Sequence, residues 1–404
     1  MSLTSSEVLV ANLCKRSFLS LWSEANPVAK QGKELCDVAV VCGRDVILFS
    51  VKEIAFKDTG KGTVDWERWR RKAVDESVKQ LYGADRFLRD RLRLLRSDGT
   101  EGLILPPLAD RRVHQIAVAL GSRGQVPYHQ GDFGKGFVHV MDESSLHIVL
   151  KELDTITDFV HYLSTKQALL ESGVKILMED NEEDLLALYI HRGRKFPEGQ
   201  DLWVIAGDIW NGILCKPEWR ARKELDRESY VWDRLIETLI KLGDSGQQDT
   251  TEARDNLEEG LRAMALENRF SRRILAAGFN EFMREAAAKK VRARIMPSLS
   301  NVHYVFLASS RDEDREHRRR ELTLRCFIAR GRLGSQGDTV VGIATEQYAR
   351  GQGFSLDACF LWKPTWTAED QVEFQGIQRD LGYFVNPRKS RATGDEFPHV
   401  GPVP

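Results

Sequence analysis

The sequence predicts an α/β protein with an N-terminal mixed sheet flanked by helices, a helical middle region and a small C-terminal α/β domain. Three observations lead to this prediction. Two runs rich in β-branched residues surround Gly43-Arg44, helical apolar stripes precede and follow them, and strands and helices alternate again from about residue 297. A chain of 404 residues is too long for one ordinary domain. We expect three parts, at 1–200, 201–296 and 297–404.

Composition restricts the classes of function. The net charge is −1, so affinity for nucleic acid has to come from local patches. The six cysteines form no C-x-x-C pair, which favours reduced thiols over a disulfide or zinc framework. Because no apolar run approaches about 18 residues, we expect no membrane partner and a cytoplasmic location.

The first predicted helix spans residues 5–22. Ser5 or Ser6 can serve as its N-cap, and an apolar stripe that includes Leu13 and Phe18 has helical spacing. Glu7 lies in the first turn, where it can complete a capping arrangement or interact favourably with the positive end of the helix dipole.

A β-hairpin follows, with Gly43-Arg44 as its loop and Cys42 opposite Asp45. Side chains alternate between the faces of a strand. One face then carries Asp37, Ala39, Val41, Val46, Leu48, Ser50 and Lys52, and the other carries Val38, Val40, Ile47, Phe49 and Val51. Both faces are largely apolar, so the hairpin should lie in a sheet that is covered on both sides.

Three polar residues, Asp37, Ser50 and Lys52, converge at one end of the first face. Opposed residues on paired strands lie ~5 Å apart, so the carboxylate and the ammonium group can act on one substrate atom. Burying a charge pair is costly unless the charges are paired or used. The alternative is a core hairpin that ends in a structural ion pair.

This arrangement resembles the PD-(D/E)XK nuclease superfamily, which has the restriction-endonuclease-like fold. In that superfamily an Asp begins one strand of a hairpin and an acid-x-Lys triplet lies on the next. Asp37 matches the first acid and Lys52 matches the lysine, but Ser50 stands at the position of the second acid. The resemblance covers roughly the first 100 residues, or, in its wider alternative, the first 195, and it implies a restriction-endonuclease-like sheet in the domain 1–200.

The resemblance also implies a Mg²⁺ or Mn²⁺ site. Asp37 would be the anchoring ligand, with the Val51 carbonyl and with Glu7 or Glu34 as further candidates. Strict alternation places Glu34 on the opposite face, beside Glu53, and it reaches the site only if the chain turns before Cys36. Some branches of the superfamily use a Gln on the helix after the hairpin to steady the nucleophile or the nucleic acid, and Gln80 lies in the corresponding element.

A long basic helix is predicted from Asp65 to Arg96. Residues 66–96 hold ten Lys and Arg against five Asp and Glu, a net charge of +5. This concentration favours a track for phosphates, and the candidate contacts are Arg68, Arg71, Lys72 and Lys79. The alternative is a solvated helix face with internal ion pairs.

The remaining elements complete the α/β pattern. In the first domain we expect strands at 102–105, 113–120 and 136–141 and helices at 146–170 and 182–191. Helices at 217–243 and 251–292 follow, and then strands at 302–307, 339–345 and 357–362 with helices at 312–331 and 368–382. The C-terminal domain shows no catalytic constellation. It could bind nucleic acid, form a homo-oligomer or dock a partner protein.

The favoured function is a Mg²⁺-dependent nuclease that hydrolyses phosphodiester bonds of DNA or RNA, with DNA favoured. Lys52 would orient the attacking water and offset charge on the phosphate. The resemblance further suggests host defence or DNA processing. The alternative, supported by Ser50, is a catalytically decayed nuclease fold that binds nucleic acid or a partner protein.

Overall fold

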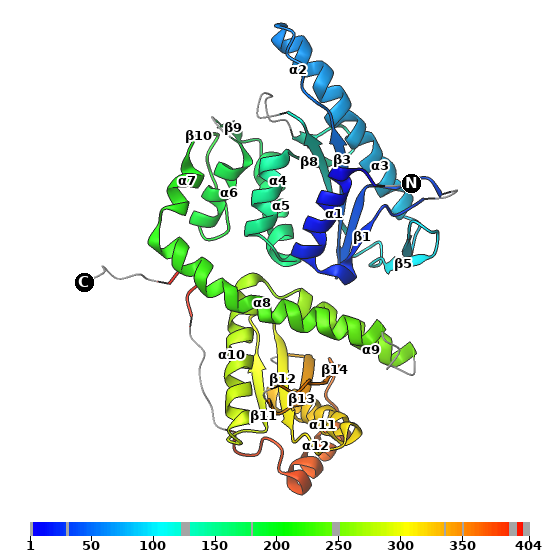
Figure 1. Cartoon of the computed structure of the whole chain (residues 1–404), viewed down its shortest axis with the longest axis vertical. Helices are drawn as coiled ribbons and strands as arrows, with labels where there is room; N and C mark the ends of the chain where they lie inside the picture. The colour runs from blue at the N-terminus through cyan, green and yellow to red at the C-terminus, as the bar shows by residue number, and fades with distance from the viewer. Residues whose placement is uncertain are drawn as a thin grey trace, which may run out of the picture. The chain divides into compact units, whose positions relative to one another are not determined.

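The computed structural model has the predicted α/β class, with a mixed sheet near the N-terminus, a helical middle region and a second sheet near the C-terminus (Figure 1). The chain divides into two compact units, Met1–Arg220 and Ala221–Pro404. The predicted boundaries at 200 and 296 stay predictions. The structure describes residues 3–29, 32–122, 130–178, 181–244, 251–334, 337–349, 351–387 and 394–398, with only the backbone at 243–244 and 251–254.

The N-terminal unit is built on a six-stranded sheet with the order β1-β2-β3-β6-β8-β7. Its strands are β1 (Ser23–Ala25), β2 (Val38–Cys42), β3 (Asp45–Glu53), β6 (Arg112–Leu120), β7 (Gly131–Asp132) and β8 (Phe137–Met141). The β3–β6 and β6–β8 pairs are parallel and the other pairs are antiparallel. The sheet is therefore mixed.

The hairpin has the predicted register, with Cys42 opposite Asp45 and Ala39 opposite Leu48. Gly43 adopts φ 60°, a left-handed conformation that glycine enters without steric cost. Fixing this two-residue turn fixes which side chains share a face.

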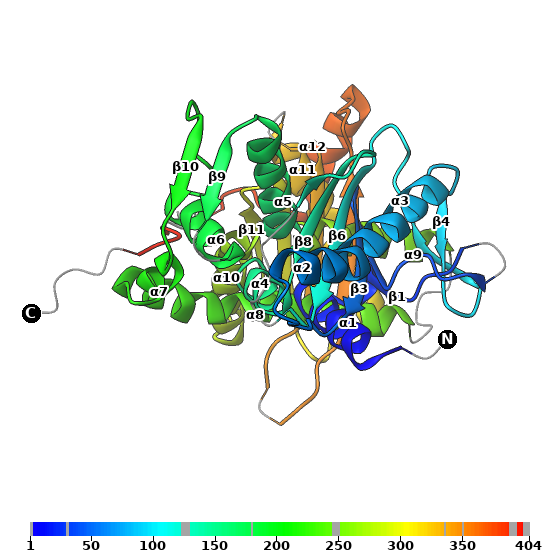
Figure 2. The same ribbon diagram turned by 90° about the horizontal axis from the view of Figure 1, so that it is seen from above.

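Helices cover both faces of the sheet, as the two apolar faces of the hairpin require. On the face of Ala39, Val41 and Leu48, α3 (Glu76–Leu88) packs through Val78 and Leu81. On the other face lie α1 (Ser5–Phe18), α4 (Glu143–Glu152) and α5 (Ile156–Glu171), where the Phe49 and Phe159 rings stack 6.4 Å apart. Figure 2 shows α1 and α3 on opposite sides of β3.

The long basic helix is shorter than predicted and contains a wider turn. It consists of α2 (Gly62–Arg70), a π turn (Arg71–Asp75) and α3, and it ends at Leu88 instead of Arg96. The guanidinium of Arg111 forms hydrogen bonds with the carbonyl groups at this end, donating to Leu88 O at 2.6 Å and to Arg91 O at 3.1 Å. The following residues form a hairpin of β4 (Arg93–Leu95) and β5 (Glu101–Ile104), whose turn contains Gly99 at φ 82°.

Two other predicted helices are each divided in two. The predicted helix 146–170 breaks before α5 because the Thr155 hydroxyl caps that helix, accepting a hydrogen bond from Asp158 N at 3.1 Å. The predicted helix 251–292 divides into α9 (Thr251–Ala265) and α10 (Arg269–Ala287), where Asn268 Oδ1 accepts from Ser271 N at 2.7 Å. In both cases a capping side chain outweighs continuous apolar spacing.

The end of the N-terminal unit contains a parallel strand pair that the sequence did not predict. Strands β9 (Lys175–Met178) and β10 (Leu202–Ile205) flank α6 (Glu182–His191). Helix α7 (Ile209–Leu214) follows and is tied to α6 by the Trp210 N–H, which donates to Asp184 Oδ1 at 2.7 Å.

The C-terminal unit contains a four-stranded sheet with the order β11-β12-β13-β14, in which only the β12–β13 pair is parallel among these strands. Its elements are α8 (Pro217–Asp244, from residue 221), α9, α10, β11 (Ala293–Pro297), β12 (Val302–Ser309), α11 (Arg315–Leu333), β13 (Thr339–Glu346), β14 (Leu356–Trp362) and α12 (Ala368–Leu381). Helix α11 packs on one face, where a Cβ at Gly342 would come within 2.5 Å of Cys326 Sγ. On the other face the Trp232 and Tyr304 rings meet at 4.8 Å.

In the part of the chain that the structure describes, the helices are too short or too polar to cross a lipid bilayer.

Candidate functional site

Asp37 lies directly before β2, and its side chain is completely buried. Its Oδ2 accepts a hydrogen bond from Val51 N at 2.7 Å, and its backbone N–H donates to Phe49 O at 3.0 Å. Its Oδ1 is buried and has no hydrogen-bond partner in the described part of the chain. One carboxylate oxygen is therefore held by β3, while the other is buried without a hydrogen-bond partner among the described residues.

The electrostatic surroundings of Asp37 bring together the other predicted charges. Burial raises the pKa of the Asp37 carboxyl group from 3.8 to about 7. The Val51 N–H and the Lys52 ammonium oppose this increase, whereas the charges of Glu34 and Glu7 add to it. All three predicted charged partners thus lie close enough to act on Asp37.

A hydrogen-bonded chain joins Ser50, Gln80 and Glu34. Ser50 Oγ donates to Gln80 Oε1 at 2.7 Å, and Gln80 Nε2 donates to Glu34 Oε1 at 2.9 Å. Because α3 packs on the Ser50 face of the hairpin, Gln80 can reach both partners. The amide of Gln80 therefore connects the Ser50 hydroxyl to a carboxylate supplied by another segment.

Glu34 reaches this site because the chain turns before the strand begins. Strand β2 starts only at Val38, so strict alternation does not extend back to Glu34. Residue 34 instead forms an isolated bridge with Val28, and Leu35 N donates to Pro27 O at 2.8 Å. Of the two placements left open by the sequence, the one beside Glu53 is wrong and the one near Asp37 is observed.

Glu7 has a capping role, but its partner is not the one predicted. Thr4 is the N-cap, because α1 already begins at Ser5. Glu7 Oε2 accepts from Thr4 N at 2.8 Å, and Glu7 N donates to Thr4 Oγ1 at 3.3 Å, which completes a capping box. Ser6, the other predicted cap, donates its hydroxyl to Glu53 instead. Glu7 therefore stabilises the helix and also contributes charge near Asp37.

Lys52 is half-buried on β3, opposite Ala119 of β6. Within the described ranges its ammonium group forms no hydrogen bond or ion pair, and it lowers the pKa of Asp37 through its charge. The Lys52 ammonium is thus close enough to affect the Asp37 carboxylate through its charge but forms no ion pair with it.

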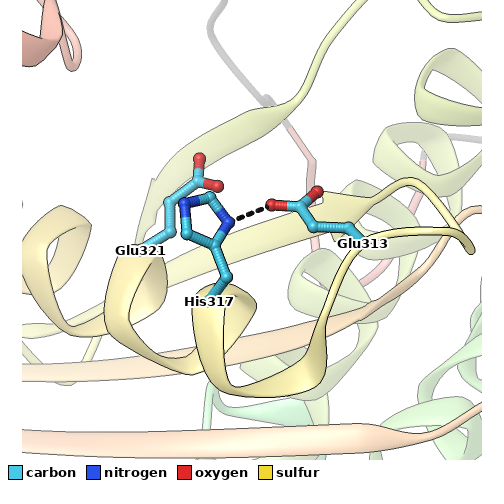
Figure 3. Close-up of side chains that lie close together, drawn as sticks. All are labelled: Glu313, His317 and Glu321. Atoms are coloured by element: carbon cyan, nitrogen blue, oxygen red, sulfur yellow. Dashed lines mark hydrogen bonds and ion pairs between the residues drawn. The ribbon is translucent and has the colours of Figure 1, made fainter.

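The acids of this site are near one another but not gathered around a common point. Among the described residues, one group of three acid, His or Cys ligand atoms lies within 4.8 Å of one another, and it is not this one. That group is Glu313, His317 and Glu321, at four-residue spacing on and before α11 (Figure 3).

The group on α11 is already neutralised by arginines. Arg292 Nη2 lies 2.7 Å from Glu313 Oε1, and Arg292 Nε lies 2.9 Å from Glu321 Oε1. Arg325 Nε donates to the same Glu321 oxygen at 2.7 Å, and His317 Nδ1 lies 2.6 Å from Glu313 Oε1. Two guanidinium groups balance two carboxylates, so the cluster is an ion-pair network that a cation would first have to displace.

The four predicted phosphate contacts are exposed and differ in their partners. Arg68 Nη1 lies 3.4 Å from Asp65 Oδ1, so its charge is partly satisfied. The side chains of Arg71, Lys72 and Lys79 make no hydrogen bond or ion pair with any residue that the structure describes. Arg71 and Lys72 lie in the π turn, and Lys79 lies on α3 beside Gln80.

The sequence reasoning placed Gln80 in the correct element but did not foresee its bond to Glu34. That bond joins residues 46 positions apart, and no local pattern encodes such a separation. Comparisons of the sequence with models of protein families and with curated proteins gave no match.

Proposed function

We propose that the chain is a divalent-metal-dependent nuclease of the PD-(D/E)XK type in which Glu34, held by Gln80, replaces the acid missing at Ser50. The observation that carries the proposal is the buried Oδ1 of Asp37, which has no hydrogen-bond partner among the described residues. The charges of Lys52 and Glu34 both affect the same carboxylate. A hard oxygen donor without a partner suits Mg²⁺ or Mn²⁺, which bind few carboxylates and retain water and phosphate ligands. DNA is the favoured substrate, and RNA is the other.

The donors for such an ion would be Asp37 Oδ1, the Val51 carbonyl and a carboxylate from Glu34 or Glu7. When bound, the ion would lower the pKa of a coordinated water and offset the charge of the scissile phosphate. Lys52 would donate a hydrogen bond to the attacking water or to a phosphate oxygen, where an ammonium stabilises charge that develops in the transition state. Gln80 would hold the Glu34 carboxylate in place.

The test is cleavage of plasmid, linear duplex, single-stranded DNA and RNA with Mg²⁺ or Mn²⁺. We expect Asp37→Ala to abolish both metal binding and cleavage. Lys52→Ala should keep metal binding and reduce cleavage by about 10²–10³-fold, which is typical for loss of one charge-stabilising donor. Ser50→Glu, which restores the usual acid, should tighten metal binding.

A matched control is Lys57→Ala, which removes an exposed lysine of the segment that follows β3. Its cleavage rate should equal that of the wild type. Wild-type cleavage in Asp37→Ala, Lys52→Ala and Ser50→Glu alike would show that the hairpin is not the active site.

A second candidate function is a decayed nuclease fold that binds nucleic acid or a protein partner. Ser50 favours it, as does the absence of three ligand atoms within 4.8 Å at this site among the described residues. Wild-type protein that neither binds metal nor cleaves any substrate, together with a Ser50→Glu variant that gains both properties, would establish this alternative.

A further inference from the structure

A cavity of about 460 Å³ lies within the C-terminal unit, where the sequence indicated no site. Its walls come from α8, α10, the connection after β12, the end of β13, the connection from β13 to β14 and the first residue of β14. Leu235, Phe279 and Leu356 form a buried apolar floor, and Tyr348 and Phe354 on the rim are 68% and 65% exposed. The volume is within the range of about 300–1,000 Å³ that is usual for small-molecule sites.

The cavity lies at the edge of the sheet where open α/β folds bind ligands. Strands β12 and β13 are parallel, and Arg311 and Thr345 line the cavity just after the end of β12 and near the end of β13. Crevices outside the carboxyl ends of parallel strands are preferred ligand positions in such sheets.

Three cations line the cavity without a carboxylate partner in the described part of the chain. Arg311 donates only to backbone carbonyls, those of Gln347 at 3.1 Å and Gly353 at 3.0 Å. The Arg284 side chain donates only to the Asn280 carbonyl of its own helix, at 3.4 Å, and the Arg234 side chain makes no hydrogen bond or ion pair with a described residue. An anionic group entering the cavity would therefore meet uncompensated positive charge.

The acid on the cavity wall does not neutralise these arginines. Glu346 Oε1 lies 2.7 Å from Arg318 Nη1, and Glu346 Oε2 accepts from Ser355 N at 2.7 Å. Although burial raises the pKa of Glu346, the hydrogen bonds from Ser355 and Arg318 hold it at about 2. Its charge is thus already paired with Arg318.

We infer that this cavity binds a small amphipathic anion, with its apolar body on the Leu235–Phe279 floor and its carboxylate, sulfonate or phosphate group at Arg234, Arg284 and Arg311. The inference is independent of the nuclease proposal, since every lining residue belongs to the C-terminal unit. An apolar body gains free energy from burial, and a charge-assisted hydrogen bond to a guanidinium fixes its orientation.

The test uses anilinonaphthalene sulfonate as a fluorescent probe on the full chain. We expect the wild type to bind the probe saturably at one site. In the double variant Arg234→Gln/Arg284→Gln the affinity of this site should fall about tenfold or more. Thr238→Trp should fill the cavity and remove the same site. If Thr238→Trp does not fold, the exposed arginine variants still decide the question. Arg227→Gln, on the same helix as Arg234 but outside the cavity and 75% exposed, is the control for loss of a surface arginine and should bind as the wild type does.

Competition then distinguishes the apolar body from the anion. Naphthyl phosphate and decanoate should displace the probe, whereas naphthol and decanol should require about tenfold higher concentrations. Preference for naphthyl phosphate would indicate an aromatic phosphate as the ligand, and preference for decanoate an aliphatic acid. Absence of saturable binding, equal displacement by the neutral analogues, or an equal loss in Arg227→Gln would overturn the inference.

Discussion

An unpaired carboxylate oxygen inside a protein is costly when charged, and Asp37 carries one. Protonation relieves this cost, which explains why burial raises the pKa of Asp37 from 3.8 to about 7. Between these two values the folded protein binds a proton that the unfolded chain has released. The stability supplied by this proton is fully present below pH 3.8 and is lost as the pH rises to about 7.

Replacing Asp37 by Asn should remove this pH dependence. In the absence of metal we expect the two proteins to be similarly stable at about pH 4, and Asp37→Asn to be more stable above about pH 7, by on the order of a few kcal/mol. Thermal unfolding across this range measures the difference. Parallel stability curves for the two proteins would contradict the raised pKa.

Adding Mn²⁺ to the wild type above about pH 7 should narrow this difference, because an ion that binds only the folded state stabilises it by an amount that grows with the logarithm of the ion concentration. The Asn variant, which lacks the charged ligand, should gain little.

At the scale of elements, the helix formed by α2, the π turn and α3 presents three cations that are free of partners among the described residues. The triple variant Arg71→Ala/Lys72→Ala/Lys79→Ala should weaken binding to duplex DNA. The slope of log affinity against log salt should become shallower by about 0.9 for each phosphate that these cations no longer neutralise. Affinities measured by fluorescence anisotropy over a series of salt concentrations test this.

The control for this variant removes equal charge from the C-terminal unit. Arg227, Arg320 and Arg379 are 75%, 74% and 79% exposed, and their triple Ala variant should bind DNA with a nearly unchanged slope. Equal changes of the salt slope in both triple variants would mean that DNA affinity depends on the net charge of the protein and not on the position of these cations.

The elements also show where sequence reasoning succeeds. The hairpin was predictable because Gly43 determines the turn and two apolar faces determine the register. The end of the basic helix at Leu88 was not, because it depends on Arg111, which is 23 residues away. Glu34 could not be placed by alternation, which holds only inside a strand. The cavity of the C-terminal unit was missed because its lining comes from segments as far apart as Val231 and Leu356.

At the scale of the whole molecule, the division at Arg220 makes a prediction about fragments. Residues 1–220 should fold alone, and residues 1–200 should be much less stable, because they lack β10 and α7. The longer fragment retains the buried Trp203, Ile205, Ile213 and Trp219. Each large apolar side chain contributes about 1.5–3 kcal/mol when fully buried, and a typical domain has only about 5–15 kcal/mol in total.

Urea unfolding of both fragments, followed by circular dichroism, measures this difference. Fragments of equal stability would place the domain boundary at residue 200. They would also mean that the β9–β10 pair contributes little to the stability of the N-terminal unit. The residues 221–404 alone should show no cleavage, since Asp37, Lys52 and Glu34 all lie in the other unit.

The π turn at Arg71–Asp75 has a consequence for how this chain tolerates changes in length. Such a turn holds one residue more than an α-helical turn. Deleting Lys72 can therefore convert the π turn into a regular α-helical turn. The hydrogen bond from Trp69 Nε1 to the Ile54 carbonyl, at 2.7 Å, and the hydrogen bond between Ser50 and Gln80 are then both kept. After Gln80 the helix is a regular α-helix without an extra residue. A deletion there would rotate Leu88 by about 100° away from the core. The chain can thus lose Lys72, one of the three exposed cations of this helix, without moving the amide that joins Ser50 to Glu34.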